Sequence, residues 1–593
     1  MKEKLAARFY VVAVLFTIIG ILIIFQMARI QIVKSGKILV DDRGPLYEIE
    51  TRTIIPERGN IYDRYGNLLA GNREVYEVGI NLLSRRLDPD TIAANLSQVL
   101  GIDYSKVLSA AKMEGLAYYP VENFATGEQI QQLEALQKEY SERPVKNRLG
   151  KDEVPPNLDA VEWTARLVRT YPENSLAGNI LGFYSFHDIN NPQSFYGIEE
   201  EYDTALSGDP VVINMSRNPN QVQTLPDLPP GSSLVLTIDR QVQLAMEDVI
   251  DRAVERTKSD SGTLIVLDPE TGEVISMAST PRMDLNSYGE QYAETFPDKT
   301  PYNRAVSQVL EPGSVFKILT MAAAIDSGKV QPDTPFIDTG SISIGGITIY
   351  NWDRGAWGPQ TMLGCMQHSL NVCLTWVAQE TGPEIFYEHL GDFGIGRKTN
   401  IDLAGENIYP MKIPGDSDWF ESSLGTNSFG QGIAVTPIQM ASAASALAND
   451  GKIMAPHILK AVSENGRQRY IQPVQVSQPV SAETARTMTE MLSTSIEVEG
   501  SDALVDGYRI AGKTGTSEIA TEFGYTTNLT NASFVGWGPS DDPKLLIYVW
   551  LEKPKTSPWG SVVASPVFSE AFSKLVVLLN IPPDEIRAQL YQN

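Results

Sequence analysis

The sequence predicts an α+β protein of several domains that follows an N-terminal membrane helix. Its 593 residues are too many for a single hydrophobic core. Residues 9–28 form an apolar run without a charge. After a Pro-rich linker at 225–233, strand-like segments stand at both ends of the remaining chain with helical segments between them. This last pattern predicts one α/β domain whose sheet is assembled from remote segments.

The apolar run reads FYVVAVLFTIIGILIIFQMA. As a helix, 20 residues span ~30 Å, about one hydrocarbon core. Lys2, Lys4 and Arg8 come before it, which favours a cytoplasmic N-terminus. The alternative is a cleaved signal peptide, whose apolar region is usually shorter and ends at a small-x-small site. We therefore expect a cytoplasmic tail at 1–8 and a single uncleaved anchor at 9–28, with the rest of the chain outside the cytoplasm.

Two regions of secondary structure are expected after the anchor. In residues 29–235, the segment 48–70 predicts two short strands around a turn, and 89–140 predicts helices that open with Asp caps. In residues 236–593, a long amphipathic helix at 239–257 is followed by a β-hairpin at 263–280. We then expect helices at 315–327, 362–380, 435–450 and 481–496, strands at 507–517, 532–539 and 544–553, and a closing helix near 566–579.

Charge and cysteine content exclude several classes of protein. The net charge of −25 would repel phosphates, so we expect no nucleic-acid partner. If Cys365 and Cys373 lie on one helix, ~12 Å of rise separates them. A disulfide needs Cα atoms within about 7 Å, so we expect two unpaired, buried cysteines. The four histidines are scattered, and no spacing of His, Cys and carboxylates indicates a metal site.

The segment EPGSVFKILT (311–320) contains a serine three residues before a lysine. On a helix, Ser314 and Lys317 would share a face. Pro312-Gly313 places Ser314 at a helix start, where the dipole and free N–H groups favour developing negative charge. A serine needs a base to act as a nucleophile, and a buried lysine can be neutral enough to serve. Taken alone, the pair more often means a helix cap and a surface lysine.

Two further pieces follow along the chain. Ser369-Leu370-Asn371 lies in a predicted helix, and Lys513-Thr514-Gly515-Thr516 lies in a predicted strand. A glycine inside a strand indicates close approach of another backbone, and we expect a peptide substrate to add there as an edge strand. The three pieces in this order are the signature of β-lactamases and penicillin-binding proteins. Neighbouring His368 is expected to point away from the site.

The chain resembles class B penicillin-binding proteins, which are membrane-anchored D,D-transpeptidases of bacterial cell-wall synthesis. The resemblance runs from the anchor to about residue 575. Besides the three pieces, its motifs are RGNIYDRYGN (58–67) with Leu69-Ala70, YGIE (196–199) through Leu206-Ser207-Gly208, LTID (236–239), NRA (303–305), and GQG (430–432) with Thr436-Pro437. It implies a mixed α/β pedestal at 29–235. It also implies a penicillin-binding domain at 236–593, with an antiparallel sheet flanked by helices and an all-helical subdomain.

The resemblance also implies a role for each candidate residue. Ser314 would attack the penultimate D-Ala of a peptidoglycan stem peptide, and Lys317 would be its base. Ser369 would relay protons to the leaving amine, and Asn371 would hold the substrate amide. Lys513, Thr514 and Thr516 would bind the terminal carboxylate in the strand that also holds Gly515. The N–H groups of Ser314 and Thr516 would form the oxyanion hole. β-Lactams would inhibit by trapping Ser314.

Partners and cofactors follow from the same resemblance. No glycosyltransferase domain fits between anchor and pedestal, so a multi-pass glycosyltransferase of the shape, elongation, division and sporulation type is the expected partner. Some relatives bind zinc through a His-Gly and a Cys in the second motif. The corresponding residues here are Trp357-Gly358 and Leu370, so we expect no metal and no cofactor. The expected location is the bacterial cytoplasmic (inner) membrane, with a role in division or elongation.

Three alternative functions use the same residues or the same frame. A D,D-carboxypeptidase or β-lactamase would transfer the acyl group to water, and the long pedestal argues against it. A β-lactam-sensing receptor would need a cytoplasmic signalling segment, and only eight residues precede the anchor. A scaffold that activates a partner glycosyltransferase would not need the intact triple of motifs, although both roles could coexist.

Overall fold

The computed structural model describes residues 17–27, 49–143, 155–186, 192–216, 226–297, 300–521 and 524–590. The chain divides into two compact units. One comprises Met1–Arg58 with Ser207–Gly231, and the other comprises Gly59–Leu206 with Ser232–Asn593. In the first unit, β1 (Ile49–Ile54) pairs antiparallel with β8 (Val211–Ser216). All the candidate site residues lie in the second unit.

The predicted anchor is described only in part. Thr17–Met27 is an apolar helix shorter than a membrane span, and the remainder of 9–28 lies outside the described residues. Among the described helices, only Gly560–Leu578 is long and apolar enough to cross a membrane. Half of that stretch is buried, and it comprises α20 (Gly560–Val563) and α21 (Ser565–Leu578). Helix α21 packs against a β-sheet, so it is a core helix.

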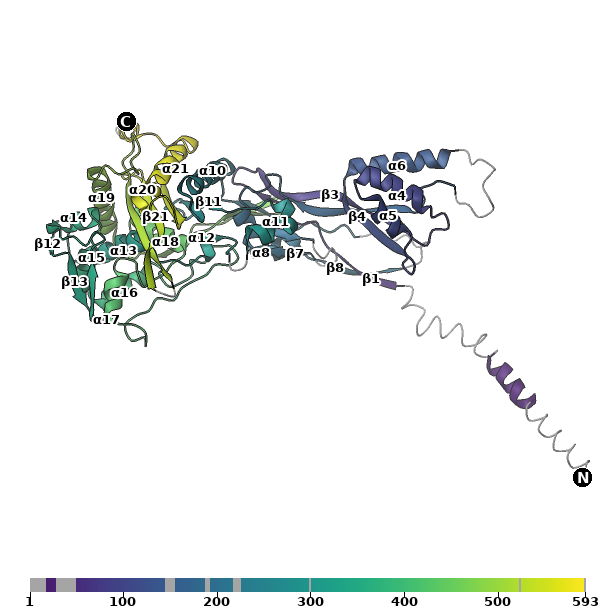
Figure 1. The fold of residues 1–593 in the computed structure, drawn as a ribbon, viewed down its shortest axis with the longest axis horizontal. Coiled ribbons are helices and arrows are strands. Elements are labelled where there is room, and N and C mark those ends of the chain that lie inside the picture. The colour runs from purple at the N-terminus through teal and green to yellow at the C-terminus, as the bar shows by residue number, and fades with distance from the viewer. Residues whose placement is uncertain are drawn as a thin grey trace, which may run out of the picture. The chain divides into compact units, whose positions relative to one another are not determined.

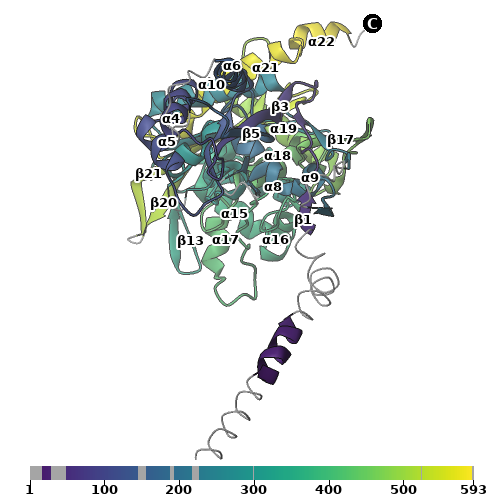
Figure 2. The same cartoon turned by 90° about the vertical axis from the view of Figure 1, so that its right-hand side faces the viewer.

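A five-stranded antiparallel sheet is assembled within residues 236–593 (Figures 1 and 2). Its order is β11-β10-β22-β21-β20, so strands from both ends of residues 236–593 lie side by side, as predicted. The bounds are β10 (Ser261–Leu267), β11 (Val274–Thr280), β20 (Ala511–Thr521), β21 (Gly524–Gly538) and β22 (Leu545–Glu552). The strand that carries Lys513-Thr514-Gly515 is the edge strand β20.

The central strand β22 shows why this sheet is covered on both faces. Its sequence LLIYVWLE is apolar almost throughout, and successive side chains of a strand point to opposite faces. Ile547 and Val549 join the core under α10 (Arg240–Thr257) and α21. Tyr548 and Trp550 join the larger core on the other face, which also contains residues of the helical segments 318–325 and 373–378.

A second sheet carries strands from much of the second unit. Its order is β18-β17-β9-β2-β3-β4, with β5 paired to β3. The helices α4 (Pro89–Leu100), α5 (Tyr104–Ala111) and α6 (Gly127–Glu142) confirm most of the helical region predicted at 89–140, but strand β4 interrupts it. The three helices share a core with β3 and β5. The strands are β2 (Ile61–Tyr62), β3 (Leu68–Asn81), β4 (Tyr118–Ala125), β5 (Val161–Thr170), β9 (Ser233–Leu236), β17 (Leu459–Glu464) and β18 (Arg467–Tyr470).

Further helices lie on the side of the five-stranded sheet where Tyr548 and Trp550 are buried. They are α13 (Lys317–Asp326), α14 (Met362–Gln367), α15 (Asn371–Thr381), α16 (Pro383–Asp392), α17 (Glu421–Asn427), α18 (Pro437–Ser445) and α19 (Ala482–Val498). The α+β class is therefore confirmed. The prediction of one continuous helix at 362–380 is wrong, because the helix is interrupted between α14 and α15.

Candidate active site

Ser314 lies in a short 3-10 turn, η4 (Gly313–Phe316), that leads directly into α13. Gly313 has φ 60°, and a Cβ there would lie 2.6 Å from the carbonyl oxygen of Thr516. Only glycine fits this close approach. Val315 and Phe316 are buried, whereas Ser314 is partly exposed. Within the described residues, no group is hydrogen-bonded to the Ser314 hydroxyl, so it is available to a substrate.

Lys317 is the first residue of α13 and is fully buried. Its Nζ donates to the carbonyl oxygen of Ser369 and to Asn371 Oδ1, each at 2.7 Å, and lies 3.1 Å from Ser369 Oγ. None of these oxygens carries a charge. Burial, together with the nearby cation of Lys513, holds the pKa of Lys317 well below its usual value. A neutral amine, as a general base requires, is therefore favoured at this position.

The second motif lies in the break between α14 and α15. Ser369 has φ 54°, a left-handed conformation that is uncommon for residues other than glycine. Asn371 begins α15 and donates from Nδ2 to the Tyr350 carbonyl oxygen at 3.1 Å, while its Oδ1 accepts from Lys317. The amide of Asn371 thus orients Lys317 in this structure. Its expected contact with a substrate amide stays a prediction.

Cys365 and Cys373 form a disulfide with 6.0 Å between their Cα atoms, so the prediction of unpaired cysteines was wrong. That prediction assumed one continuous helix. Instead, Cys365 lies in α14 and Cys373 in α15, and the left-handed turn at Ser369 brings the two helices together. Both cysteines are fully buried. The disulfide closes a short loop that contains every atom contacted by Lys317 Nζ.

The third motif runs along the edge strand β20, beside η4. Lys513 is 5% exposed, and its Nζ makes only long contacts to Thr514, at 3.3 and 3.4 Å. Burial lowers the pKa of Lys513 to about 8, and the carboxylate of Glu499 acts in the opposite direction. Thr516 Oγ1 accepts from the N–H of Gly560 at 3.0 Å, at the start of α20.

The reason that the structure gives for a glycine at position 515 differs from the predicted one. A Cβ on Gly515 would lie 2.3 Å from Ser533 Oγ and 2.8 Å from Val315 Cγ1. A Cβ on Gly560 would lie 2.2 Å from the Gly515 carbonyl oxygen. The protein's own packing therefore requires the glycine. Addition of a substrate strand to β20 stays a prediction.

Some groups that build the site were not identified from the sequence as site residues. Gly430 approaches Gly313 so closely that a Cβ there would lie 2.3 Å from the Gly313 carbonyl oxygen. The Glu311 carboxylate accepts from the Gly432 N–H at 3.0 Å. The Gly-Gln-Gly spacing was a visible signal for this contact. The sequence offers no signal for the Tyr350 carbonyl or for Glu499, because the residues that they contact lie far away along the chain.

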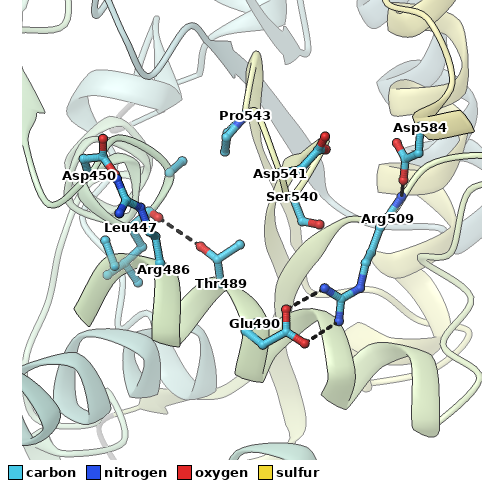
Figure 3. A pocket seen from close by; sticks show the side chains of 12 residues that line it. Leu447, Asp450, Arg486, Thr489, Glu490, Arg509, Ser540, Asp541, Pro543 and Asp584 are labelled. Carbon is cyan, nitrogen blue, oxygen red and sulfur yellow. Dashed lines mark hydrogen bonds and ion pairs between the residues drawn. The ribbon is translucent and has the colours of Figure 1, made fainter. Parts of the chain in front are cut away.

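One cavity lies away from the three motifs (Figure 3). It has a volume of about 390 Å³ and lies beside the first half of α19. Its arginines are already paired, Arg486 with Asp450 at 2.9 Å and Arg509 with Glu490 at 2.6 Å. A second cavity of about 230 Å³ lies near residues 391–400. Neither cavity is lined by a motif residue, so the chemistry of the motifs identifies the site better than cavity size does.

The positions that correspond to a zinc cluster in some relatives are filled by apolar contacts. Leu370 is fully buried in the core, and the Trp357 ring stacks on the His368 ring at 4.2 Å between centroids. Within the described part of the chain, no group of three His, Cys, Asp or Glu side chains is placed to hold a metal ion. A site without metal or cofactor stays a prediction.

Comparison with known proteins agrees with this geometry. The family described as the penicillin binding protein transpeptidase domain matches residues 262–573, and the penicillin-binding protein dimerisation domain matches residues 53–230. The chain belongs to the class B penicillin-binding proteins. Stage V sporulation protein D of Bacillus subtilis is 31% identical over 546 residues, which cover 89% of this chain and 79% of that protein. The probable peptidoglycan D,D-transpeptidase PbpC of Pseudomonas aeruginosa is 28% identical, with 98% and 96% of the two chains covered.

Solved structures of the family share the fold. Penicillin binding protein 2X from Streptococcus thermophilus superposes with a TM-score of 0.72 at 22% identity, covering 89% of this chain and 80% of that one. Penicillin binding protein 3 of Mycobacterium tuberculosis, in complex with aztreonam, superposes with a TM-score of 0.66 at 25% identity, covering 90% and 98%. The match to the transpeptidase domain, together with relatives named peptidoglycan D,D-transpeptidases, shows that this penicillin-binding protein is a transpeptidase of the serine acyltransferase type, as the resemblance implied.

Proposed function

We propose that this penicillin-binding protein cross-links peptidoglycan stem peptides through an acyl-enzyme on Ser314. The observation that carries the proposal is the burial of Lys317 one helical turn from a partly exposed serine, with no carboxylate among the described residues paired with it. A lysine in such an environment can accept a proton at neutral pH. The D-Ala-D-Ala end of a stem peptide is the proposed donor.

In the first step, Ser314 Oγ forms a bond to the carbonyl carbon of the penultimate D-Ala. The Ser314 proton passes to Lys317 Nζ, and the carbon–nitrogen bond to the terminal D-Ala breaks. Ser369 Oγ, 3.1 Å from Lys317 Nζ, relays a proton to the leaving amine. In the second step, the amine nitrogen of a neighbouring stem peptide forms a bond to the ester carbonyl carbon, and the bond from that carbon to Ser314 Oγ breaks. The proton lost by the amine passes through Lys317 Nζ to Ser314 Oγ.

Binding of the donor uses the edge strand β20. Lys513, Thr514 and Thr516 are the proposed partners of the terminal carboxylate, because a cation and two hydroxyls lie on one short segment at Gly515. The N–H groups of Ser314 and Thr516 are the proposed donors to the oxyanion. Such preorganised donors stabilise the tetrahedral intermediate of acyl transfer. Asn371 is proposed to contact the substrate amide as well as Lys317.

Location and partner belong to the same proposal. Residues 9–28 would anchor the protein in the bacterial cytoplasmic membrane, with the catalytic region outside the cytoplasm. A multi-pass glycosyltransferase of the shape, elongation, division and sporulation type would supply the glycan strands, through contacts with the anchor and the pedestal. The pathway, division or elongation, would follow from that partner.

The test is acylation by a labelled penicillin, with the adduct located by peptide mass mapping. We expect one adduct on Ser314, absent from Ser314→Ala. Incubation with stem-peptide polymer should then yield cross-linked dimers. Free pentapeptide trimming without dimers would identify a carboxypeptidase, and absence of any adduct would overturn the acyl-enzyme proposal.

A further inference from the structure

A turn at residues 350–355 is anchored to the second motif. The carbonyl oxygen of Tyr350 accepts a hydrogen bond from Asn371 Nδ2 at 3.1 Å. The next residue, Asn351, is buried, and its Oδ1 accepts from the N–H of Val372 at 3.2 Å. Both contacts join the turn to the first two residues of α15. Any group that the turn carries is therefore held in a fixed place beside the second motif.

The same turn also contacts the third motif's surroundings through a pair of tryptophans. Trp352 Nε1 donates to the carbonyl oxygen of His368, the residue before the second motif, at 3.2 Å. The Trp352 ring meets the Trp559 ring in a T-shaped contact, with 5.6 Å between their centroids. Trp559 is followed by Gly560, whose N–H donates to Thr516 Oγ1 at 3.0 Å. The turn is thus in contact with elements on the sides of both motifs.

Within this turn, Arg354 carries a charge that the neighbouring acid does not neutralise. Its guanidinium carbon lies 5.4 Å from the centroid of the Tyr350 ring, in a cation–π contact. Asp353 has other partners, since its carboxylate accepts from the Gly355 N–H at 2.9 Å and from Trp357 Nε1 at 3.2 Å. Among the described residues, no ion pair joins Arg354 to a carboxylate, although the chain has a net charge of −25.

The backbone of Arg354 is held in an uncommon conformation. Its φ is 57°, in the left-handed region that costs free energy for a residue other than glycine. The Arg354 N–H donates to the Asn351 carbonyl oxygen at 3.0 Å, and Asn351 Nδ2 donates to the Gly355 carbonyl oxygen at 3.1 Å. These two bonds close the turn around Arg354, whose side chain is exposed. A fixed and exposed guanidinium is well prepared to bind an anion.

We propose that Arg354 is a specificity-determining residue that binds a free carboxylate of the donor stem peptide, upstream of D-Ala-D-Ala. This inference rests on the proposed function. There, the terminal carboxylate of the donor is assigned to Lys513, Thr514 and Thr516, so a further cation calls for a further anion. Asn371, which is bonded to the same turn, is the proposed partner of the donor's amide. The upstream residues of the donor would therefore pass beside Arg354.

The expected effect is a preference among donors. A guanidinium can pair with both oxygens of a carboxylate, whereas an uncharged amide offers it no counter-charge. Because Arg354 is exposed, solvent screens the pair, and we expect the carboxylate to raise the rate of donor acylation about fivefold. Benzylpenicillin has no carboxylate other than the one that corresponds to the donor's terminus, so its reaction should not depend on Arg354.

The experiment measures how fast full-length protein releases the first D-Ala from synthetic pentapeptides, without an acceptor amine, so that the donor alone is tested. One peptide carries free carboxylates on its second and third residues, and two others have one or the other of these carboxylates amidated. The variants are Arg354→Gln, Arg354→Lys and Arg354→Glu. Arg467→Gln is the matched control, since Arg467 is an exposed arginine of β18, outside the three motifs.

We expect wild type to react about fivefold more slowly when the recognised carboxylate is amidated. The peptide that shows this loss identifies which residue of the donor carries that carboxylate. Arg354→Gln should remove the preference, Arg354→Lys should keep part of it, and Arg354→Glu should reverse it. Arg467→Gln should behave as wild type, and acylation by benzylpenicillin should be the same in every variant.

The outcomes separate this inference from the proposed function. If wild-type protein forms no penicillin adduct on Ser314, the proposed function fails first. If wild type forms the adduct but reacts with no peptide, or reacts equally with all three, recognition by Arg354 is overturned. A preference that survives in Arg354→Gln also overturns it. So does an equal loss of rate with penicillin and every peptide, because a structural defect would not depend on the carboxylate.

Discussion

Lys317 Nζ contacts three uncharged oxygens, and this environment determines whether its amine carries a charge. An ammonium ion without a carboxylate partner is costly to bury, so the neutral amine is favoured. Above the folded-state pKa of Lys317, the unfolded chain binds a proton that the folded chain does not. The contribution of Lys317 to stability therefore rises with pH between its lowered folded-state pKa and its unfolded value.

Replacement Lys317→Met should separate chemistry from stability. The variant keeps the length and apolar stem of the side chain but has no base, so penicillin acylation of Ser314 should fall by about 10²–10⁴-fold. The free energy of unfolding should be equal or higher at neutral pH, because no buried amine has to be kept neutral. Stopped-flow acylation and urea unfolding measure the two quantities. A large loss of stability would contradict this account of the Lys317 environment.

At the scale of elements, the candidate active site depends on how closely η4, β20 and α20 approach one another. Gly313, Gly515 and Gly560 lie at these contacts, and a Cβ on any of them would collide with backbone or side-chain atoms. The third motif is therefore held against Ser314 by backbone packing. The disulfide between α14 and α15 has the same effect on the second motif.

Gly515→Ala should disturb this packing. The new methyl group would meet Ser533 Oγ and Val315 Cγ1, so β20 must move away from η4. We expect a loss of about 1–3 kcal/mol in the free energy of unfolding, together with slower acylation. Gly289→Ala is the control, since a Cβ there meets nothing within 4 Å in α11 (Tyr288–Thr295). Equal effects of the two substitutions would exclude the packing explanation.

The double variant Cys365→Ala/Cys373→Ala tests the disulfide. In the chain-entropy account, a closed loop of this length stabilises the folded state by about 2.5 kcal/mol. We expect the midpoint of urea unfolding to fall accordingly. Acylation should slow as well, because Ser369 and Asn371 lose their constraint. An unchanged midpoint would show that the packing of α14 and α15 alone holds the loop.

At the scale of the whole molecule, a buried ion pair connects segments that lie far apart in sequence. Arg169 of β5 donates to Glu199 of α8 (Gly197–Glu201) at 2.6 Å, and both side chains are almost fully buried. Arg169 also donates to the Gly59 carbonyl oxygen at 2.7 Å, and the Tyr171 hydroxyl donates to Glu199. The motifs around residues 58–67 and 196–199 therefore meet at one polar cluster within the second unit.

Glu199→Gln should be strongly destabilising, since it leaves the buried Arg169 cation without a counter-charge. The expected loss is about 3–5 kcal/mol. Glu173→Gln is the control, because its ion pair with Arg240 is about one-third exposed and should contribute less than ~1 kcal/mol. Thermal unfolding at neutral pH compares the two. Similar melting temperatures for both variants would contradict the importance of the buried pair.

The predictions from sequence were best where a signal is local. Apolar residues along β22 and the Asp cap before α4 are properties of short segments, so these elements were predicted correctly. The break at Ser369 was missed, because a left-handed serine has no mark in the sequence. The cysteine prediction failed for the same reason, since the spacing of eight residues was converted into a distance along a continuous helix.

The sequence by itself determined the family, the α+β class and the order of the three motifs, because periodicity, turn residues and motif spacing are written along the chain. Only the tertiary structure decided which groups surround Lys317, why Gly515 must be glycine, and that Cys365 pairs with Cys373. These depend on contacts between segments more than 50 residues apart, such as Lys317 with Ser369, or on one backbone angle at Ser369. The burial that lowers the pKa of Lys317 is a property of the folded chain.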